Sequence, residues 1–172
     1  MRGPGDTWGF ILAAAFVCAP ALFVTARAAQ RNEIAALQER FDRETDPVHK
    51  AKLMQRLGVD EFDTIEKEVN DGSLPEAARI LEQYREEARS CVEGLDAKKI
   101  NAAKHSSGFK QLQISLQEAL RRLDEILPAL TADQQPAFIA ARSEIQEMND
   151  HLVQELFPGG PLGNPPAGRS SH

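Results

Sequence analysis

The residues best suited to binding chemistry are five basic side chains within a stretch of thirteen residues that contains no acid. They are Lys98, Lys99, Lys104, His105 and Lys110. A cluster of this kind favours contact with an anionic group, such as a phosphate, a lipid head group or an acidic protein. Lysines near the end of a helix also complement the helix dipole and then need no ligand. The cluster is therefore a candidate contact site for an anionic partner, with a purely structural role as the alternative.

The remaining reactive side chains form no catalytic or metal-binding pattern. Cys91 falls among apolar residues at helical spacing, which predicts a buried thiol rather than a redox site. Ser107 and Lys110 match the Ser-x-x-Lys pattern of penicillin-interacting enzymes, whose two further motifs are absent. No histidine has a second His or Cys at the spacing that metal ligands need. The sequence predicts neither an enzyme nor a metal site nor a cofactor.

The composition is that of a folded protein. Of 172 residues, 42% are hydrophobic and 27% are charged, and the net charge is −6. Without residues 1–28 the chain carries 18 basic and 25 acidic side chains, a net charge of −7. Binding to nucleic acid needs a basic face that displaces phosphate counterions, so this balance argues against nucleic acid as a partner. Because Cys18 lies in the N-terminal apolar run, Cys91 is left without a disulfide partner.

Two long heptad patterns between Leu74 and Leu130 are the centre of the predicted fold. Their apolar residues alternate at steps of three and four, which predicts two helices that each carry one apolar seam. The polar break at residues 105–108 lets the second helix fold back, so the sequence predicts an αα-hairpin. The seams are Leu74, Ala77, Leu81, Tyr84, Ala88, Cys91 and Leu95 in the first helix, and Phe109, Leu112, Leu116, Ala119, Leu123, Ile126 and Leu130 in the second.

Shorter helices are expected ahead of the hairpin. Residues 31–43 form an amphipathic segment that either docks on the hairpin or tethers it. Asp46 and Pro47 are typical of a helix start, Gly58 is typical of a left-handed helix end, and Asp60 is expected to begin a new helix.

The ends of the hairpin helices carry their own signals. Ser73 and Glu76 fit a capping box for the first helix, which is expected to run to about Ala103. Gly94 inside it indicates either a closely packed neighbour or a helix that weakens beyond Leu95. The second helix is expected from about residue 107 to Leu127, where Pro128 ends or kinks it.

A third heptad helix is expected from about residue 133 to residue 157, followed by a Pro- and Gly-rich tail over 158–172 that predicts disorder. Its seam is Phe138, Ala141, Ile145, Met148 and Leu152. No segment alternates with the period of a strand. The predicted fold is an all-α bundle of long antiparallel helices over residues 30–157.

The N-terminal segment over 1–28 predicts export. Residues 10–24 are uncharged, Arg2 precedes them, and Ala26-Arg27-Ala28 forms a small-x-small cleavage site, which is typical of a secretory signal peptide. The apolar run is 15 residues long, shorter than the roughly 20 that span a membrane. The alternative is an uncleaved anchor over residues 8–29.

One short motif resembles a known family. Residues 130–134, Leu-Thr-Ala-Asp-Gln, match the Leu-Thr-x-x-Gln motif of small periplasmic helical proteins, which include stress-response chaperones and metal-resistance proteins. The resemblance implies a cradle-like antiparallel helical dimer that shields unfolded proteins on a concave surface. The family usually carries a second copy of the motif, and the methionine- or histidine-rich segments of some members are also missing here.

These observations predict a non-enzymatic protein-interaction module of the cell envelope, exported to the periplasm or cell exterior or tethered to the membrane. A chaperone-like role of the Leu-Thr-x-x-Gln type is the second hypothesis. We expect protein partners, and the seams are compatible with both a monomer and a homodimer.

Overall fold

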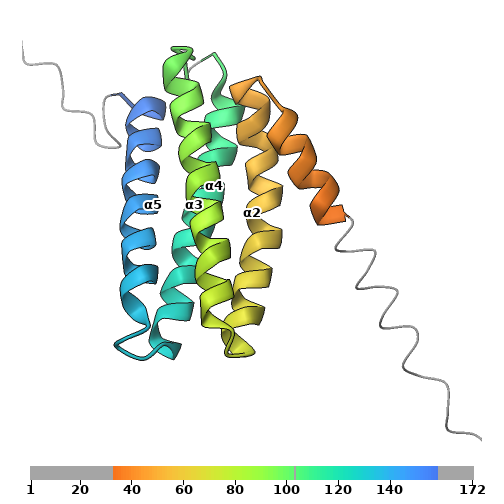
Figure 1. Cartoon of the computed structure of the whole chain (residues 1–172). Helices are drawn as coiled ribbons and strands as arrows, with labels where there is room; N and C mark the ends of the chain where they lie inside the picture. The colour runs from red at the N-terminus through yellow and green to blue at the C-terminus, as the bar shows by residue number, and fades with distance from the viewer. Residues whose placement is uncertain (1–32, 103, 159–172) are drawn as a thin grey trace, which may run out of the picture. The chain divides into compact units, whose positions relative to one another are not determined.

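The computed structural model describes residues 33–102 and 104–158, and within them every regular element is helical. The four long helices are α2 (Pro47–Asn70), α3 (Leu74–Ala97), α4 (Ser106–Ile126) and α5 (Gln135–Leu156) (Figure 1). A 3₁₀ turn, η1 (Leu127–Ala129), follows α4, and a shorter helix over 33–43 precedes α2. The chain divides into two units, Met1–Glu33 and Ile34–His172, and the fold described here is that of the second. The predicted all-α bundle is confirmed.

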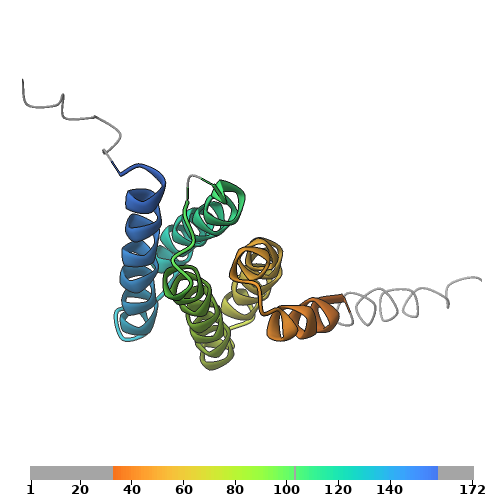
Figure 2. The same cartoon turned by 90° about the horizontal axis from the view of Figure 1, so that it is seen from above.

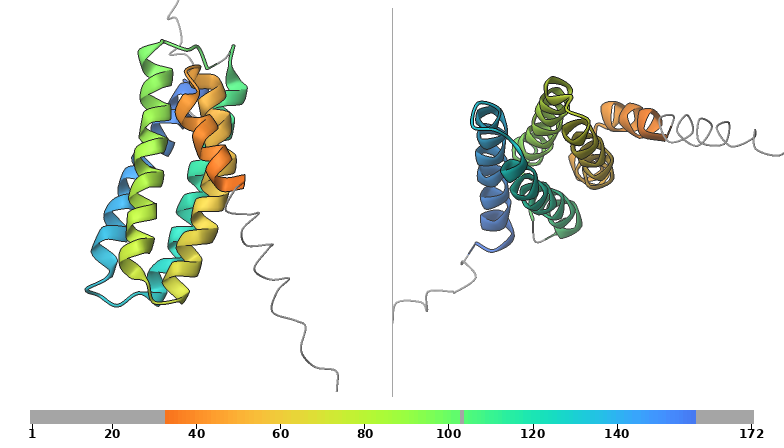
Figure 3. Two further views of the ribbon diagram at one scale, coloured as in Figure 1. Left: turned by 45° about the vertical axis from the view of Figure 1, so that its right-hand side comes forward. Right: turned by 90° about the horizontal axis from the view of Figure 1, so that it is seen from below.

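The long helices form a four-helix bundle made of two hairpins. α2 runs antiparallel to α3, and α4 runs antiparallel to α5, so that the two short turns lie at one end of the bundle (Figures 1 and 3). The hairpins pack so that α2 lies beside α4 and α3 lies beside α5 (Figure 2). Within each of these two pairs the helices run parallel to one another (Figure 1).

The prediction that α3 and α4 would pack side by side is wrong, because they occupy diagonally opposite corners of the bundle (Figure 2). Their connection runs from residue 98 to residue 105, and eight residues can reach about 26 Å. A bundle diagonal is only about 14 Å when neighbouring helices are about 10 Å apart. The connection is therefore long enough to cross the end of the bundle, whereas the three residues between α2 and α3 are not. The eight residues between α4 and α5, which include η1, join neighbouring helices instead.

The helix α2 begins as predicted and then continues through the position where an end was expected. Asp46 accepts a hydrogen bond from the backbone N–H of His49 at 2.9 Å, and Pro47 occupies the first turn. Gly58 lies in the middle of a continuous 24-residue helix and is buried, so the predicted end at Gly58 and restart at Asp60 are wrong. Gly58 allows Tyr84 and Ser115 to pack closely against α2 and does not end the helix.

The ends of α3 differ from the sequence prediction. The Ser73 side chain makes no capping hydrogen bond, and Glu76 pairs with Arg79 instead, so the predicted capping box does not form. The helix stops at Ala97 rather than about Ala103, because Lys99 adopts a left-handed conformation with φ of 49°. The N–H of Ile100 then bonds the carbonyl of Leu95, and the N–H of Lys99 bonds that of Asp96, which completes a Schellman motif. A β-carbon on Gly94 would lie 3.3 Å from Cβ of Pro47. Gly94 therefore has a closely packed neighbour, and the helix also ends soon after Leu95.

The predicted seams supply the core. Every seam residue of α3 and α4 is buried apart from Leu74, which is partly buried against the core, and Met148 in α5 is likewise partly buried. The short helix over 33–43 docks on the bundle, with Leu37 and Phe41 buried and the Lys50 ammonium 4.5 Å from the centre of the Phe41 ring. Burial of these side chains removes apolar surface from water, the main stabilising contribution in a bundle of this size.

Charged side chains link three of the neighbouring helix pairs. Arg122 of α4 pairs with Asp63 and Glu66 of α2, and Arg142 of α5 pairs with Asp124 of α4. Between α3 and α5, Arg85 and Arg89 both bond Glu144, and His151 bonds Asp96. These pairs favour the observed neighbours over other arrangements of the same amphipathic helices.

The N-terminal apolar run and the C-terminal tail, over 1–32 and 159–172, lie outside the described residues. Among the helices that the structure describes, none is long and apolar enough to cross a membrane.

Candidate binding groove between α2 and α4

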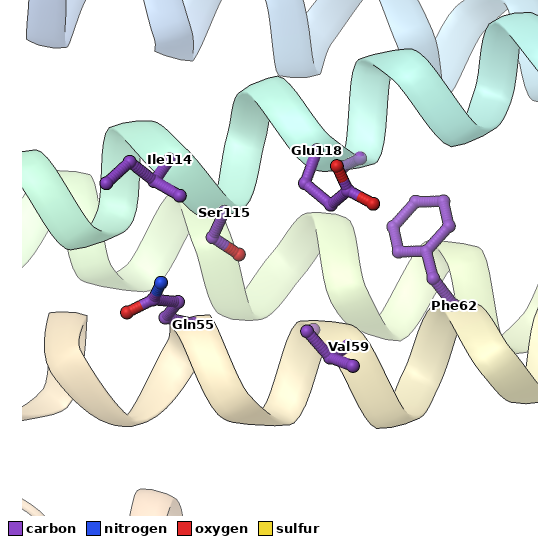
Figure 4. Close-up of a pocket in the computed structure, with 8 residues that line it drawn as sticks. Gln55, Val59, Phe62, Ile114, Ser115 and Glu118 are labelled. Atoms are coloured by element: carbon purple, nitrogen blue, oxygen red, sulfur yellow. The ribbon is translucent and has the colours of Figure 1, made fainter.

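A groove of about 250 Å³ lies between the parallel helices α2 and α4, on the side away from α3 (Figure 4). Two of its apolar side chains are half exposed: Val59 is 47% exposed and Ile114 is 48% exposed. Exposed aliphatic side chains that line a concavity are typical of binding surfaces, whereas isolated ones are common on any protein. The lining residues are Gln55, Gly58, Val59, Phe62, Ile114, Ser115, Glu118 and Ala119.

Small residues make the groove hollow, and a buried tyrosine supports them from beneath. A β-carbon on Gly58 would lie 2.7 Å from Cε2 of Tyr84 and 2.9 Å from Oγ of Ser115. The Tyr84 hydroxyl donates to the carbonyl of Ser115 at 3.1 Å and lies 3.2 Å from its Oγ. Burial raises the pKa of Tyr84, so the phenol stays neutral and keeps its hydrogen. The floor is therefore closely packed, and its polar groups are satisfied.

Contacts between α2 and α4 hold the two helices together beyond each end of the groove. At one end Arg122 pairs with Asp63 and Glu66, donates to the carbonyl of Val59 and lies 5.8 Å from the Phe62 ring centre. At the other end the helices approach so closely that a β-carbon on Gly108 would lie 2.9 Å from Cγ1 of Val48. These contacts keep α2 and α4 side by side on both sides of the groove.

Three cations lie beside the groove, in the N-terminal halves of the two helices that form it. Lys52 and Arg56 lie on α2 one turn before Gln55 and Val59, and Lys110 lies on α4 one turn before Ile114. Residues three or four apart share a helix face, so these side chains lie on the same faces as the lining residues. None of the three has an acidic partner among the described residues. At the opposite end, Arg121 and Arg122 are both paired with carboxylates.

The predicted basic cluster lies at the end of the bundle that the diagonal connection crosses, and all five side chains are exposed. Lys98 donates from Nζ to the carbonyl of Thr45 at 3.0 Å, and Lys99 forms the left-handed turn. Lys104 and His105 precede α4, and Lys110 lies one turn inside it. Only Lys110 adjoins the groove, and contact of the cluster with an anionic partner stays a prediction.

The other residues singled out from the sequence have structural surroundings. Cys91 is buried, and burial raises the pKa of its thiol to about 12, which disfavours the reactive thiolate. Within the described residues, no group of three or more His, Cys, Asp or Glu side chains could hold a metal ion. In the Leu-Thr-x-x-Gln motif, the Gln134 side chain accepts from the Thr131 N–H at 2.9 Å and Leu130 is buried, so the motif shapes the turn before α5.

Sequence reasoning missed two carboxyl groups between α2 and α3, the buried Glu61 and the partly buried Glu87. Glu61 is only 5% exposed, and neither of its carboxylate oxygens has a hydrogen-bond partner among the described residues. Burial, with the charges of Glu87 and Asp60, raises the pKa of Glu61 to about 9. Burial also raises the pKa of Glu87, although its Oε1 accepts from Gln38 at 2.7 Å and from Gln83 at 3.1 Å. The signal in the sequence was spacing, since Met54, Glu61 and Ile65 share one face of α2.

No protein-family model, curated protein or solved structure matches this chain.

Proposed function

We propose that this chain is a non-enzymatic protein-interaction module and that the α2–α4 groove binds its partner. The observation that carries the proposal is the pair of half-exposed aliphatic side chains, Val59 and Ile114, above a closely packed floor of small residues. A groove whose shape is fixed in the free protein loses little conformational entropy when a partner binds.

The chemistry of the lining supports binding rather than catalysis. Glu118 is the one ionisable side chain that lines the groove, and Arg121 pairs with it. That pairing lowers the pKa of Glu118, which makes it a poor general base near neutral pH. The Ser115 hydroxyl is engaged with Tyr84 rather than with a base that could activate it.

We propose a location in the cell envelope, on the strength of the apolar run over 10–24 and the Ala26-Arg27-Ala28 site. Intact mass and fractionation of an export-competent bacterium that expresses the full chain test this. Loss of residues 1–28 with recovery in the soluble envelope fraction supports secretion. A full-length mass in the membrane fraction supports an anchor over residues 8–29, and recovery in the cytoplasm overturns the location.

The binding role is tested by site-specific photo-crosslinking in the cells that produce the protein. A photoreactive residue at position 114 reports on the groove, and one at position 139 is the matched control, because Ile139 on α5 is 50% exposed. We expect adducts of defined mass at 114 that are absent at 139. Val59→Asp should remove them, whereas Ile139→Asp should not. Adducts that are equal at both positions contradict the groove as the binding surface.

The chaperone-like alternative predicts a different pattern. It predicts diffuse adducts of many masses and suppression of aggregation for two unrelated heat-denatured enzymes. Because a chaperone surface recognises exposed apolar chain rather than one partner, suppression should not depend on Lys98, Lys99 or Lys104. The basic cluster is proposed as a second contact for an acidic partner, so charge reversal there should weaken a specific complex.

A further inference from the structure

We propose that the α2–α4 groove binds an amphipathic α-helix of a partner protein, antiparallel to both α2 and α4, with acidic residues in its C-terminal half. This inference rests on the proposed binding function and specifies the chemistry of the partner.

The shape of the groove suits a helix. Gly58, Ser115 and Ala119 form its floor, and Val59 and Ile114 project from the two helices that border it (Figure 4). An amphipathic helix presents an apolar stripe with spacing three and four, and such a stripe fits between two helices of a bundle. The occupant would become an additional helix in contact with both α2 and α4, and it would cover the half-exposed Val59 and Ile114 side chains.

The direction follows from the parallel arrangement of α2 and α4. Both helices begin at the same end of the bundle (Figure 1), so their positive dipole ends lie together. Because the dipole acts only over the first turn of each helix, it favours the antiparallel direction for an occupant whose negative C-terminal end extends to that end of the bundle. An antiparallel pair of helices would impose no such preference, since their dipoles oppose one another.

The charges select the same orientation. Lys52, Arg56 and Lys110 lie in the N-terminal halves of α2 and α4 and have no acidic partner among the described residues. At the other end Arg121 and Arg122 are neutralised by Glu118, Glu125, Asp63 and Glu66. In a chain with a net charge of −6, unpaired cations beside an apolar groove are complementary to acidic residues on the partner. The partner's acidic residues therefore belong in its C-terminal half.

Three synthetic peptides of about 14 residues, about 21 Å long as helices, test the inference by titration of the ¹⁵N-labelled full chain. All carry the same leucine stripe. The first has glutamates in its C-terminal half, the second has glutamines in their place, and the third has the glutamates in its N-terminal half. The readouts are the amide shifts of Val59 and Ile114 and the affinity obtained from them.

We expect the first peptide to bind about tenfold more tightly than the other two at low salt, since exposed ion pairs contribute about 0.2–1 kcal/mol each. The difference should shrink at high salt. A nitroxide at the C-terminus of the first peptide should broaden the signals of Lys52 and Lys110 rather than that of Arg122. The triple variant Lys52→Glu/Arg56→Glu/Lys110→Glu should remove the preference. Lys98→Glu/Lys99→Glu/Lys104→Glu, with the same change of net charge, should reduce it less than threefold.

Several outcomes overturn the inference. Equal affinity for the three peptides, the opposite nitroxide pattern, or equal effects of the two triple variants would each exclude the charge-selected orientation. A concentration-dependent dimer in sedimentation that Ile114→Asp abolishes would show that a second copy of the chain occupies the groove. Absence of peptide binding excludes a helix as the occupant. The cross-link at position 114 then decides separately whether the groove binds a partner of another shape, so the two proposals fail independently.

Discussion

The helix α2 has two faces that each bring polar groups into the interior, and they do so in opposite ways. On the face toward α4, Gly58 allows the Tyr84 ring to approach, and the tyrosine hydroxyl reaches Ser115 at 3.1–3.2 Å. On the face toward α3, Glu61 is as deeply buried as many core residues, yet its carboxyl oxygens have no hydrogen-bond partner among the described residues. The same helix therefore packs against one satisfied polar contact, between Tyr84 of α3 and Ser115 of α4, and carries one unsatisfied carboxyl of its own.

The two faces of α2 therefore differ in how their stability depends on pH. A satisfied polar contact inside a core stabilises one arrangement and leaves the floor of the groove rigid. A buried carboxyl without a partner is tolerated only while it keeps its proton. We therefore expect the α2–α4 face to be insensitive to pH and the α2–α3 face, where the helix over 33–43 also docks through Gln38, to weaken at alkaline pH.

The largest effect is expected from Gly58→Leu, which disrupts the close packing of α2 against Tyr84 and Ser115. The β-carbon would lie 2.7 Å from the Tyr84 ring, so either α2 or the ring must move and the contact with Ser115 is lost. Overpacking and a stranded hydroxyl outweigh the better helix propensity of leucine, and we expect the free energy of unfolding to fall by about 4 kcal/mol. Urea denaturation followed by circular dichroism measures it.

Gln117→Leu is the matched control, since Gln117 is an exposed position of α4. It adds a leucine without burying it and should change the unfolding free energy by less than about 0.5 kcal/mol. Equal stability of Gly58→Leu and the control would show that the floor of the groove rearranges freely, and the contrast between the two faces of α2 would not hold.

The second prediction concerns the buried carboxyl of Glu61 and the pH dependence of stability that it causes. The pKa of Glu61 is about 9 in the folded state, far above 4.5, so between these values the folded chain keeps a proton that the unfolded chain releases. The free energy of unfolding should therefore fall as pH rises, by up to about 1.4 kcal/mol per pH unit from this group. The contribution is fully present below pH 4.5 and is lost by about pH 9.

Glu61→Gln should remove this dependence. The difference in unfolding free energy between Glu61→Gln and the unmodified chain should rise by about 3 kcal/mol from pH 5.5 to pH 8, measured by denaturation at a series of pH values. Glu147→Gln, on an exposed position of α5, is the control and should give a constant difference. Parallel curves for the Glu61 variant would mean that water or another group satisfies the carboxylate, and the two faces of α2 would then be alike.

The sequence predicted the helices and their buried seams because apolar spacing reports directly which face of a helix is covered. Leu116 and Ile145 are buried for this reason. The spacing does not report which helix provides the cover, so the diagonal relation of α3 and α4 was missed. Both helices carry good seams, and an eight-residue connection permits the crossing without requiring it, since α4 and α5 are joined by eight residues and lie side by side.

The candidate groove was not predictable in the same way. Gly58 was interpreted as a helix end, since glycine favours ends by its backbone, whereas here its missing side chain admits Tyr84. Helix termination at Lys99 carried no glycine signal either, because lysine itself adopts the left-handed conformation. Val59 and Ile114 lie on different helices, and only the packing of α2 beside α4 places them on one surface.

The smallest effect is expected from Tyr84→Phe, which removes only the hydroxyl. The Ser115 Oγ still lies 3.5 Å from the carbonyl of Met54, so the free energy of unfolding should fall by about 1 kcal/mol.

A double-mutant cycle of Tyr84→Phe with Ser115→Ala, measured by urea denaturation at pH 7, isolates the energy of the contact. We expect a stabilising coupling there, and a destabilising one for Glu61→Gln with Glu87→Gln at pH 9, where both carboxyls tend to ionise and repel one another. Couplings of the same sign would make the polar contacts on the two faces of α2 energetically equivalent. Opposite signs would show that the Tyr84–Ser115 contact stabilises the bundle and that the Glu61–Glu87 pair destabilises it at alkaline pH.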